Sequence, residues 1–225
     1  MKLICITGID GAGKTTLARN IVARLQRQGK RSTYLYGRTY PILSRFLMTL
    51  GRSVFLRREN IWREYPAYSA NKKRLMTNPL FSNIYTLAVL IDYYLQIWIK
   101  LLVKSFGNEV LVLDRYIYDT VINDLAVHLC YSEEQTVRAI QRGLRFLPRP
   151  VLLALMDIPE EVAIRRKSDI PHIDYLRERR YLYLSLRRLA EIWIINGEKG
   201  PDNILEEALE RIDRTYENEL REPIG

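Results

Sequence analysis

The sequence predicts an α/β fold in which a five-stranded parallel sheet is flanked by helices, as a three-layer sandwich. Short apolar runs alternate with segments of helical periodicity along the chain. The first apolar run ends in a glycine-rich turn that opens a helix, and no repeat, low-complexity tract or linker interrupts the 225 residues. We therefore expect one domain over 1–225, because this length supports one sizeable core rather than two.

The predicted strands are short apolar runs bounded by polar or turn residues. They span residues 2–8, 32–37, 109–114, 150–157 and 191–197. Between them, apolar residues at three- and four-residue spacing predict helices that cover both faces of the sheet. These are a segment that stops at Gly29, then 82–106, 133–146, 160–167, 174–190 and 202–220. Region 38–81 is rich in Arg, Tyr and Pro and is expected to hold short helices and loops near the site.

The run from 84 to 103 has the length of a membrane span but carries polar residues at helical spacing. Asp92 lies near its middle, with Gln96 and Lys100 one and two turns further on. A central Asp costs roughly 2.5–3.5 kcal/mol in a spanning helix. The favoured interpretation is a long, mostly buried helix with one polar stripe, at a subunit contact as one option, and no membrane partner.

The formal net charge of +9 invites a nucleic-acid interpretation, because basic proteins attract polyanions. The basic residues are scattered, however, and none comes with a DNA- or RNA-binding signature, so nucleic acid is not the expected partner. The two cysteines, Cys5 and Cys130, lie far apart in sequence and suggest no disulfide framework. A reducing, cytoplasmic setting is therefore expected.

The stretch GIDGAGKT, residues 8–15, follows the first predicted strand and satisfies the pattern G-x-x-x-x-G-K-[ST]. Glycines let the backbone N–H groups turn toward anionic oxygens, and the helix N-terminus adds partial positive charge. We expect Lys14 to reach the terminal phosphates of a nucleotide and the Thr15 hydroxyl to hold Mg²⁺. No guanine-reading [NT]-K-x-D follows a strand, which disfavours GTP. The nucleotide-binding residues are expected to be Gly8, Ile9, Asp10, Gly11, Ala12, Gly13, Lys14, Thr15 and Thr16.

A second charged group follows the third predicted strand, in the stretch VLVLDRY. Asp114 would stand at the carboxyl end of a buried strand, where ligands bind in this architecture. Its carboxylate can hold Mg²⁺ or a metal-bound water, and the neighbouring Arg115 can form a fork onto a phosphate. The sequence therefore predicts a second phosphate site, for an acceptor.

Taken in order, GIDGAGKTT, VLDRY and MDIPEEVAIRRK resemble the motifs of the thymidylate kinases. The resemblance extends over essentially the whole chain, from Lys2 to about Ile212. It implies the P-loop kinase form of the three-layer sandwich, ATP and Mg²⁺ as cofactors, and often a homodimer. It also implies transfer of the γ-phosphate of ATP to a nucleoside monophosphate, with dTMP as the leading acceptor.

The same resemblance assigns roles at matching positions. Asp10 matches the family carboxylate near the acceptor sugar and phosphate, and Arg115 matches the arginine that binds the acceptor phosphate. Arg38 matches the arginine of the R-x-P segment, with one extra residue before the proline. Two arginines would neutralise a dianion and hold it in line with the γ-phosphate. The acceptor set is Asp10, Arg38, Tyr93, Arg115, Tyr116 and Asn123, and the metal set is Thr15 and Asp114.

The mobile lid of the family corresponds to about residues 164–175. Where the glycine-rich loop lacks an arginine, as here, the lid of family members supplies the catalytic one, to stabilise charge during transfer. Arg165 and Arg166 are the nearest candidates, and Arg177 and Arg180 compete with them. The expected catalytic set is therefore Lys14, Arg115, Arg165 and Arg166.

Two features of the family pattern are altered. The usual lid segment with arginine, glycine and glutamate is replaced by SDIPHIDYL. The thymine-reading F-x-x-x-R pattern on the long helix is replaced by Val89 and Tyr93. Tyr93 could stack on a base, with core or interface packing as the alternative. Asn123 could bond a sugar hydroxyl or a base edge.

Two other functions stay open on the sequence. A deoxynucleoside kinase would share the fold but carries a carboxylate after the second strand as base for the sugar hydroxyl. Here that position reads YGRTYP, which is basic and favours an acceptor that already bears a phosphate. From a different class, a nucleotide-binding regulator or nucleic-acid-associated ATPase would bind or hydrolyse ATP without phosphorylating a small acceptor.

Overall fold

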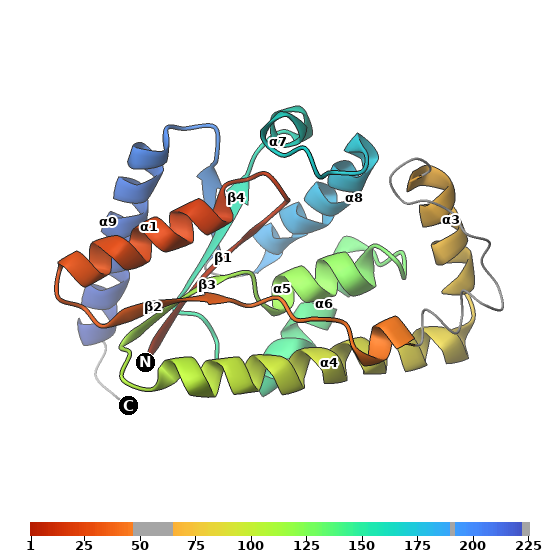
Figure 1. The fold of residues 1–225 in the computed structure, drawn as a ribbon, viewed down its shortest axis with the longest axis horizontal. Helices are drawn as coiled ribbons and strands as arrows, with labels where there is room; N and C mark the ends of the chain where they lie inside the picture. The colour runs from red at the N-terminus through yellow and green to blue at the C-terminus, as the bar shows by residue number, and fades with distance from the viewer. Residues whose placement is uncertain (47–64, 190–191, 222–225) are drawn as a thin grey trace.

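The computed structural model describes residues 1–46, 65–189 and 192–221 and is built on a central parallel sheet (Figure 1). Its five strands run in the order β2-β3-β1-β4-β5. They are β1 (Lys2–Gly8), β2 (Ser32–Tyr36), β3 (Val110–Asp114), β4 (Leu152–Asp157) and β5 (Ile192–Asn196). All five predicted strands are confirmed, and so is the fold class.

Helices cover the two faces of this sheet (Figure 1). Six match predicted segments: α1 (Lys14–Arg27), α4 (Pro79–Ser105), α6 (Glu133–Gly143), α7 (Glu160–Arg166), α8 (Ile173–Leu184) and α9 (Pro201–Arg221). Helix α1 packs on β1, β2 and β3, with α9 beside it. Helix α4 contacts β2, and α5 (Ile117–Thr120) contacts β1. Helix α3 (Tyr65–Leu75) lies in region 38–81, which was expected to hold short helices. Residues 47–64 of that region fall outside the described residues.

The sequence did not predict the helical segment after β3. Helix α5 continues into a π-helix, Val121–Ala126, and 3₁₀ turns Leu144–Phe146 and Ser185–Arg188 extend α6 and α8. Every residue of 117–123 is buried, so this segment has no exposed polar face to reveal a helical period. A π-helix is rare and is frequently found at functional sites.

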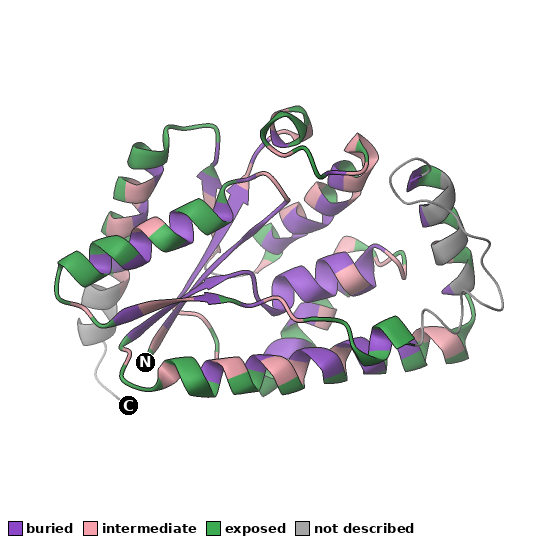
Figure 2. Cartoon of the chain, viewed as in Figure 1, coloured by how far each residue is buried: buried purple, intermediate pink, exposed green. Residues whose placement is uncertain are grey.

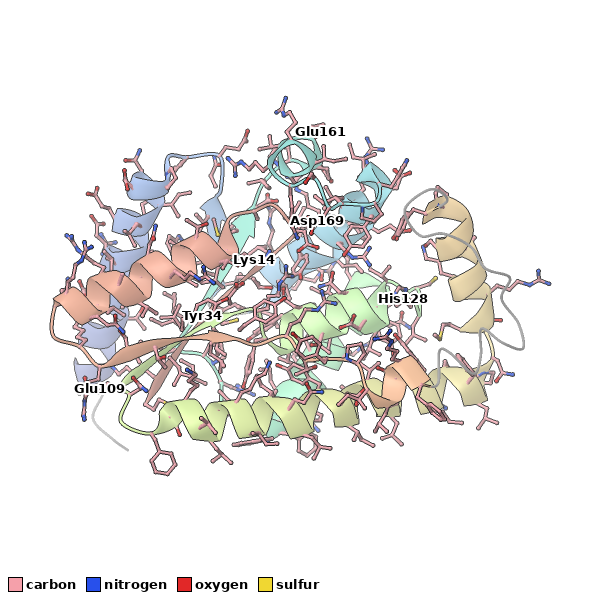
Figure 3. All side chains as sticks on the ribbon, in the orientation of Figure 1. Lys14, Tyr34, Glu109, His128, Glu161 and Asp169 are labelled. Atoms are coloured by element: carbon pink, nitrogen blue, oxygen red, sulfur yellow. The ribbon has the colours of Figure 1, made fainter. Side chains whose placement is uncertain are left out.

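The strand register brings the carboxyl ends of three central strands together. Ile6 of β1 pairs with Asp114 of β3, and Gly8 pairs with Met156 of β4. Gly8 has φ 140°, and a Cβ added there would lie 2.4 Å from the Met156 carbonyl oxygen, so only glycine fits. Figure 3 shows Lys14 at this end of the sheet and Glu109, which precedes β3, at the other.

The polar stripe on α4 binds the chain's own backbone. The Asp92 carboxylate accepts from the backbone N–H groups of residues 42–44, each at 3.0 Å. Gln96 bonds the N–H and the carbonyl of Tyr40, at 2.9 and 2.7 Å. Lys100 donates to the carbonyls of Tyr36 and Arg38. The stripe therefore clamps the segment 36–44 along α4.

The opposite side of α4 is apolar and exposed, and exposed residues recur along the helix in Figure 2. We call this the outer face of α4; it comprises Leu80, Ile84, Leu87, Ile91, Leu95, Trp98, Ile99, Leu102 and Val103. Among the described residues, α4 is the helix long and apolar enough to cross a membrane by length and composition, with 33% of that window buried.

Candidate active site

The glycine-rich loop between β1 and α1 forms the base of the site. Gly13 lies in the left-handed region at φ 92° and starts α1. Gly11 has φ 86°, and an added Cβ would lie 2.6 Å from the Ala163 carbonyl oxygen of α7. The loop thus turns back beneath α7, which is where the predicted lid begins.

Lys14 is buried at the start of α1, with 4% of its surface exposed. Its Nζ donates to the Ile9 carbonyl oxygen at 2.6 Å, so the ammonium lies inside the loop that carries it. Burial, assisted by the charge of Arg115, lowers the pKa of Lys14 to about 8. Anionic phosphate oxygens inside the loop would offer this ammonium a stronger partner than a carbonyl.

Asp114 and Thr15 meet at the end of β3, as the sequence predicts for a metal site. The Thr15 hydroxyl donates to Oδ2 of Asp114 at 2.5 Å, and the Tyr34 hydroxyl donates to the same oxygen at 2.9 Å. The other oxygen, Oδ1, is buried and has no hydrogen-bond partner among the described residues. Because Mg²⁺ prefers oxygen ligands, a buried, unpartnered carboxylate oxygen beside a hydroxyl fits this ion.

Arg115 links the loop to the acceptor side. Its guanidinium forms an ion pair with Asp10 of the loop and lies 3.4 Å from Oδ1 of Asp119. Burial alone would raise the pKa of Asp10, but the charges of Arg115 and Lys14 outweigh it and hold that pKa well below its usual value. Arg115 itself has φ 74°, a left-handed conformation that non-glycine residues rarely adopt.

Asp119 is a functional support that sequence reasoning missed. Its side chain is fully buried and accepts from the hydroxyls of Thr7 and Tyr183 at 2.9 and 2.7 Å. It also accepts from the backbone N–H of Tyr116 at 3.1 Å, which caps α5. A carboxylate with this many donors is held in one orientation, and it fixes Arg115 in turn. The sequence signal that could have identified Asp119 is a charged residue inside an apolar run after the D-R-Y motif.

Arg38 lies on the acceptor side, at the end of the segment clamped by α4. Its guanidinium pairs with Asp124 at 2.9 Å, and the Asp124 charge raises the pKa of Arg38 above its ordinary value. The charge of Arg115 opposes that shift, so the two guanidinium groups are close enough to interact. Tyr175 of α8 donates to Oδ2 of Asp10 at 3.3 Å, and its hydroxyl is close enough to Arg38 and Arg115 to interact with their charges.

Three residues assigned to the acceptor set have other environments. Tyr93 is 0% exposed and packs edge-on against the rings of Tyr94 and Tyr116, so it is a core residue that offers no face to a base. Tyr116 is also 0% exposed, and its hydroxyl donates to the Pro148 carbonyl at 3.1 Å. The Asn123 side-chain amide donates to the Asp119 carbonyl and to Tyr183, so it supports the buried network.

The lid arginines differ in what they contact. Arg166 donates to the Gly197 carbonyl at 2.9 Å. Arg180 pairs with Asp157 and Glu160, and the exposed Arg177 pairs with Asp174. Arg165 is exposed, and its side chain makes no hydrogen bond or ion pair within the described part of the chain. Arg180 therefore holds the D-x-P-E segment, and Arg165 keeps its guanidinium available.

A cavity of about 240 Å³ opens beside the glycine-rich loop. It is bounded by Thr16 and Asn20 of α1, Met156 of β4, and the loop between β5 and α9. Arg166 and Gly197 line it as well. An apolar cleft with a few polar groups, next to a phosphate-binding loop, is suited to the ring of a purine nucleotide.

The arrangement therefore offers two candidate anion sites that share one border. Lys14 and the loop backbone form one site, and Arg115 with Arg38 forms the second. Asp10 lies between them, paired with Arg115 and bonded by Tyr175. Such an arrangement can hold two phosphorylated molecules with their phosphates adjacent, which is the geometry that group transfer between them requires.

Comparisons with known proteins point the same way. The family model for adenylylsulphate kinase matches residues 1–67. A "Probable thymidylate kinase 1" of Saccharolobus solfataricus is 26% identical over 218 residues, which cover 95% of this chain and 97% of that protein. A "Probable thymidylate kinase" of Sulfolobus acidocaldarius is 26% identical, over 92% and 94%. A "Thymidylate kinase" of Xanthomonas campestris is 27% identical, over 92% and 80%. These matches confirm the resemblance that the motifs predicted.

Proposed function

We propose that this chain, an enzyme of the thymidylate kinase type, transfers the γ-phosphate of ATP to a nucleoside monophosphate, with dTMP as the favoured acceptor. The observation that carries the proposal is the second anion site. Arg115 follows β3 and Arg38 follows β2, and both lie near the edge of the glycine-rich loop. Asp10 of that loop lies between the two sites. An enzyme that only hydrolysed ATP would have no use for this second site.

The donor is held by the glycine-rich loop. The backbone N–H groups at the start of α1 and the buried Lys14 would receive the β- and γ-phosphates, with Lys14 exchanging the Ile9 carbonyl for phosphate oxygen. The purine would occupy the cavity beside Arg166 and Gly197. Thr15 and Asp114 would hold Mg²⁺, which neutralises phosphate charge when it is bound.

The acceptor phosphate would lie against Arg115 and Arg38. Both guanidinium groups are already fixed, Arg115 by Asp10 and Asp119 and Arg38 by Asp124 and the α4 clamp. Preorganised charges need little rearrangement when the phosphoryl group moves, and this is the largest contribution that such a site can make. The sugar of the acceptor would meet Asp10.

The proposed lid comprises about residues 164–175, from the end of α7 to the start of α8. Arg165 is the arginine we expect to reach the transferring phosphate, because Arg166 already contacts Gly197 at the purine cavity. Charge from the lid would reach the site only when the lid closes, which excludes water at the moment of transfer.

The outer face of α4 supports a homodimer rather than a membrane anchor. Its exposed side chains recur at positions 84, 87, 91, 95, 98 and 102, the three- and four-residue spacing of a helix-packing seam. An apolar surface of this length normally marks an interaction site. The polar stripe of the same helix is used inside the fold, which favours a soluble, cytoplasmic protein whose second copy covers the outer face.

A coupled ATP-to-ADP assay tests the proposal. ATP and Mg²⁺ are offered with dTMP, dUMP, dCMP, dAMP, dGMP, thymidine or deoxycytidine, and one reaction contains no acceptor. We expect turnover with a monophosphate, greatest with dTMP. Turnover with nucleosides alone would favour a deoxynucleoside kinase, and ADP release that ignores every acceptor would favour the regulator or ATPase.

A further inference from the structure

Arg179, on α8, is an unusual residue next to the acceptor site. It is 5% exposed, and its guanidinium carbon lies 3.5 Å from the centre of the Tyr175 ring. One terminal nitrogen donates to the Tyr65 hydroxyl at 3.1 Å and to the Tyr175 carbonyl at 3.0 Å. Its Nε, however, is buried and has no hydrogen-bond partner among the described residues.

A buried, unpartnered donor on a charged group is costly, because it loses its bonds to water and gains nothing in return. The cost is larger for a charged group than for a neutral one. The neighbours of Arg179 nevertheless hold it firmly. Tyr65, which accepts its hydrogen bond, donates in turn to Glu178 at 2.9 Å, and Lys73 pairs with Glu178 at 2.7 Å. A ligand with an acceptor atom could satisfy this donor.

The place of Arg179 identifies which ligand it meets. The stacked Tyr175 donates its hydroxyl to Asp10, so the guanidinium lies one tyrosine ring away from the border between the two anion sites. Arg115 and Arg38 already serve the acceptor phosphate there. A donor behind Tyr175 is thus suited to a part of the acceptor that lies beyond its sugar, which is the base.

The long helix α4 does not offer a residue at its two candidate base-reading positions that could contact the acceptor base. These positions, Val89 and Tyr93, are 6% and 0% exposed and pack in hydrophobic clusters. We propose that Arg179 reads the acceptor base from α8, with its Nε–H donating to a carbonyl oxygen of the base. This inference rests on the proposed function and names the specificity-determining residue of the same site.

The chemistry of the guanidinium sets the substrate class. Arginine has five N–H donors and no acceptor, so it favours a base edge with carbonyl oxygens, such as a pyrimidine-2,4-dione. An amino group at the same position, as in cytosine, would face another donor and leave both unpaired. Hydrogen bonds to charged groups contribute about 1.5–3 kcal/mol, so the preference for dTMP over dCMP that depends on Arg179 is roughly 10- to 100-fold.

The test compares Arg179→Met with the control Arg177→Met, which removes an exposed arginine of the same helix. For each variant, kcat/KM is measured with dTMP and with dCMP, together with KM for ATP and the melting temperature. Arg179→Met is expected to lose 10-fold or more in the dTMP-to-dCMP ratio, with KM for ATP unchanged. Arg177→Met is expected to keep the ratio of the unmodified protein. An unchanged ratio in Arg179→Met overturns the inference.

Arg179→Lys repeats the test if Arg179→Met does not fold. Lysine keeps the positive charge but lacks the guanidinium and its Nε–H donor, so the ratio should fall again. If the lysine variant keeps the full ratio, the inference is wrong, because charge alone then suffices. The failure of the proposed function has a different signature: the unmodified protein would phosphorylate no nucleoside monophosphate, and no ratio would exist to compare.

Discussion

Binding of ATP above pH 8 should draw a proton from solution, and Lys14 is the group that takes it up. Burial and the Arg115 charge lower the pKa of its ammonium to about 8 in the free protein, where its partner is the neutral Ile9 carbonyl. Phosphate oxygens beside Lys14 favour the charged form and restore its protonation. AMP, which lacks the terminal phosphates, should not have this effect.

The pKa sets the size of the uptake. At pH 7 about 90% of Lys14 is protonated before binding, and at pH 8.5 about 25% is. Complete protonation in the complex therefore takes up about 0.1 proton per ATP at pH 7 and about 0.75 at pH 8.5.

Isothermal titration calorimetry in two buffers of different ionisation enthalpy measures this number directly. The apparent binding enthalpy changes with the buffer in proportion to the protons exchanged. AMP serves as the control ligand and Lys14→Met as the control protein. Equal uptake at pH 7 and pH 8.5 would refute the assignment, as would an uptake at pH 8.5 that persists in Lys14→Met.

The same pKa makes the stability of the free protein depend on pH. An unfolded lysine titrates near 10.5, so between pH 8 and 10.5 the unfolded chain binds more protons than the folded chain. The free energy of unfolding therefore rises with pH in this window, by on the order of 1–2 kcal/mol from pH 8 to 9.5. Urea unfolding at these two pH values, with Lys14→Met as the flat reference, checks the sign and the size.

Other predictions follow from single contacts. Arg115→Ala should lower kcat/KM for the acceptor by about 100-fold or more while calorimetry still detects ATP binding; unchanged acceptor kinetics would remove the second anion site. Asp119→Asn should lower the free energy of unfolding by about 3 kcal/mol in urea, because it removes the charge that faces Arg115 in a buried network; a change near zero would contradict this. Asp92→Ala should expose the segment 36–44 to limited proteolysis, and protection equal to the parent would show that the clamp does not depend on this carboxylate. Leu95→Glu should convert a dimer to a monomer in light scattering, and a persistent dimer would rule out the outer face of α4 as the interface.

The strands and most helices could be predicted from the sequence because each follows from a local pattern. Apolar runs of five to seven residues become buried strands, and helical spacing with an exposed polar side marks the surface helices. The segment 117–126 lacks that contrast, because all of its polar residues except Asp124 are buried as well. Periodicity gave no signal there.

Some residues of the candidate site could likewise be predicted from local sequence, and others depend on tertiary packing. The loop at 8–15 and the pair Asp114–Arg115 were evident because their chemistry lies in consecutive residues. The expected link between Thr15 and Asp114 follows from the parallel register. The burial of Tyr93 and Arg179 could not be predicted from the sequence, because it depends on which side of a helix meets the core. That choice is made by tertiary packing of α4 and α8, which no local pattern records.

The clamp formed by Asp92, Gln96 and Lys100 binds mainly backbone N–H and carbonyl groups, which every residue type except proline carries in full. The Ser44 hydroxyl also donates to Asp92, but the other bonds of the clamp do not depend on the side chains of the segment 36–44. Helix α4 therefore provides fixed contacts to the backbone, and the side chains of the segment 36–44 can vary. A protein built in this way can exchange the residues around Arg38 to suit a new acceptor without rebuilding the frame that supports them.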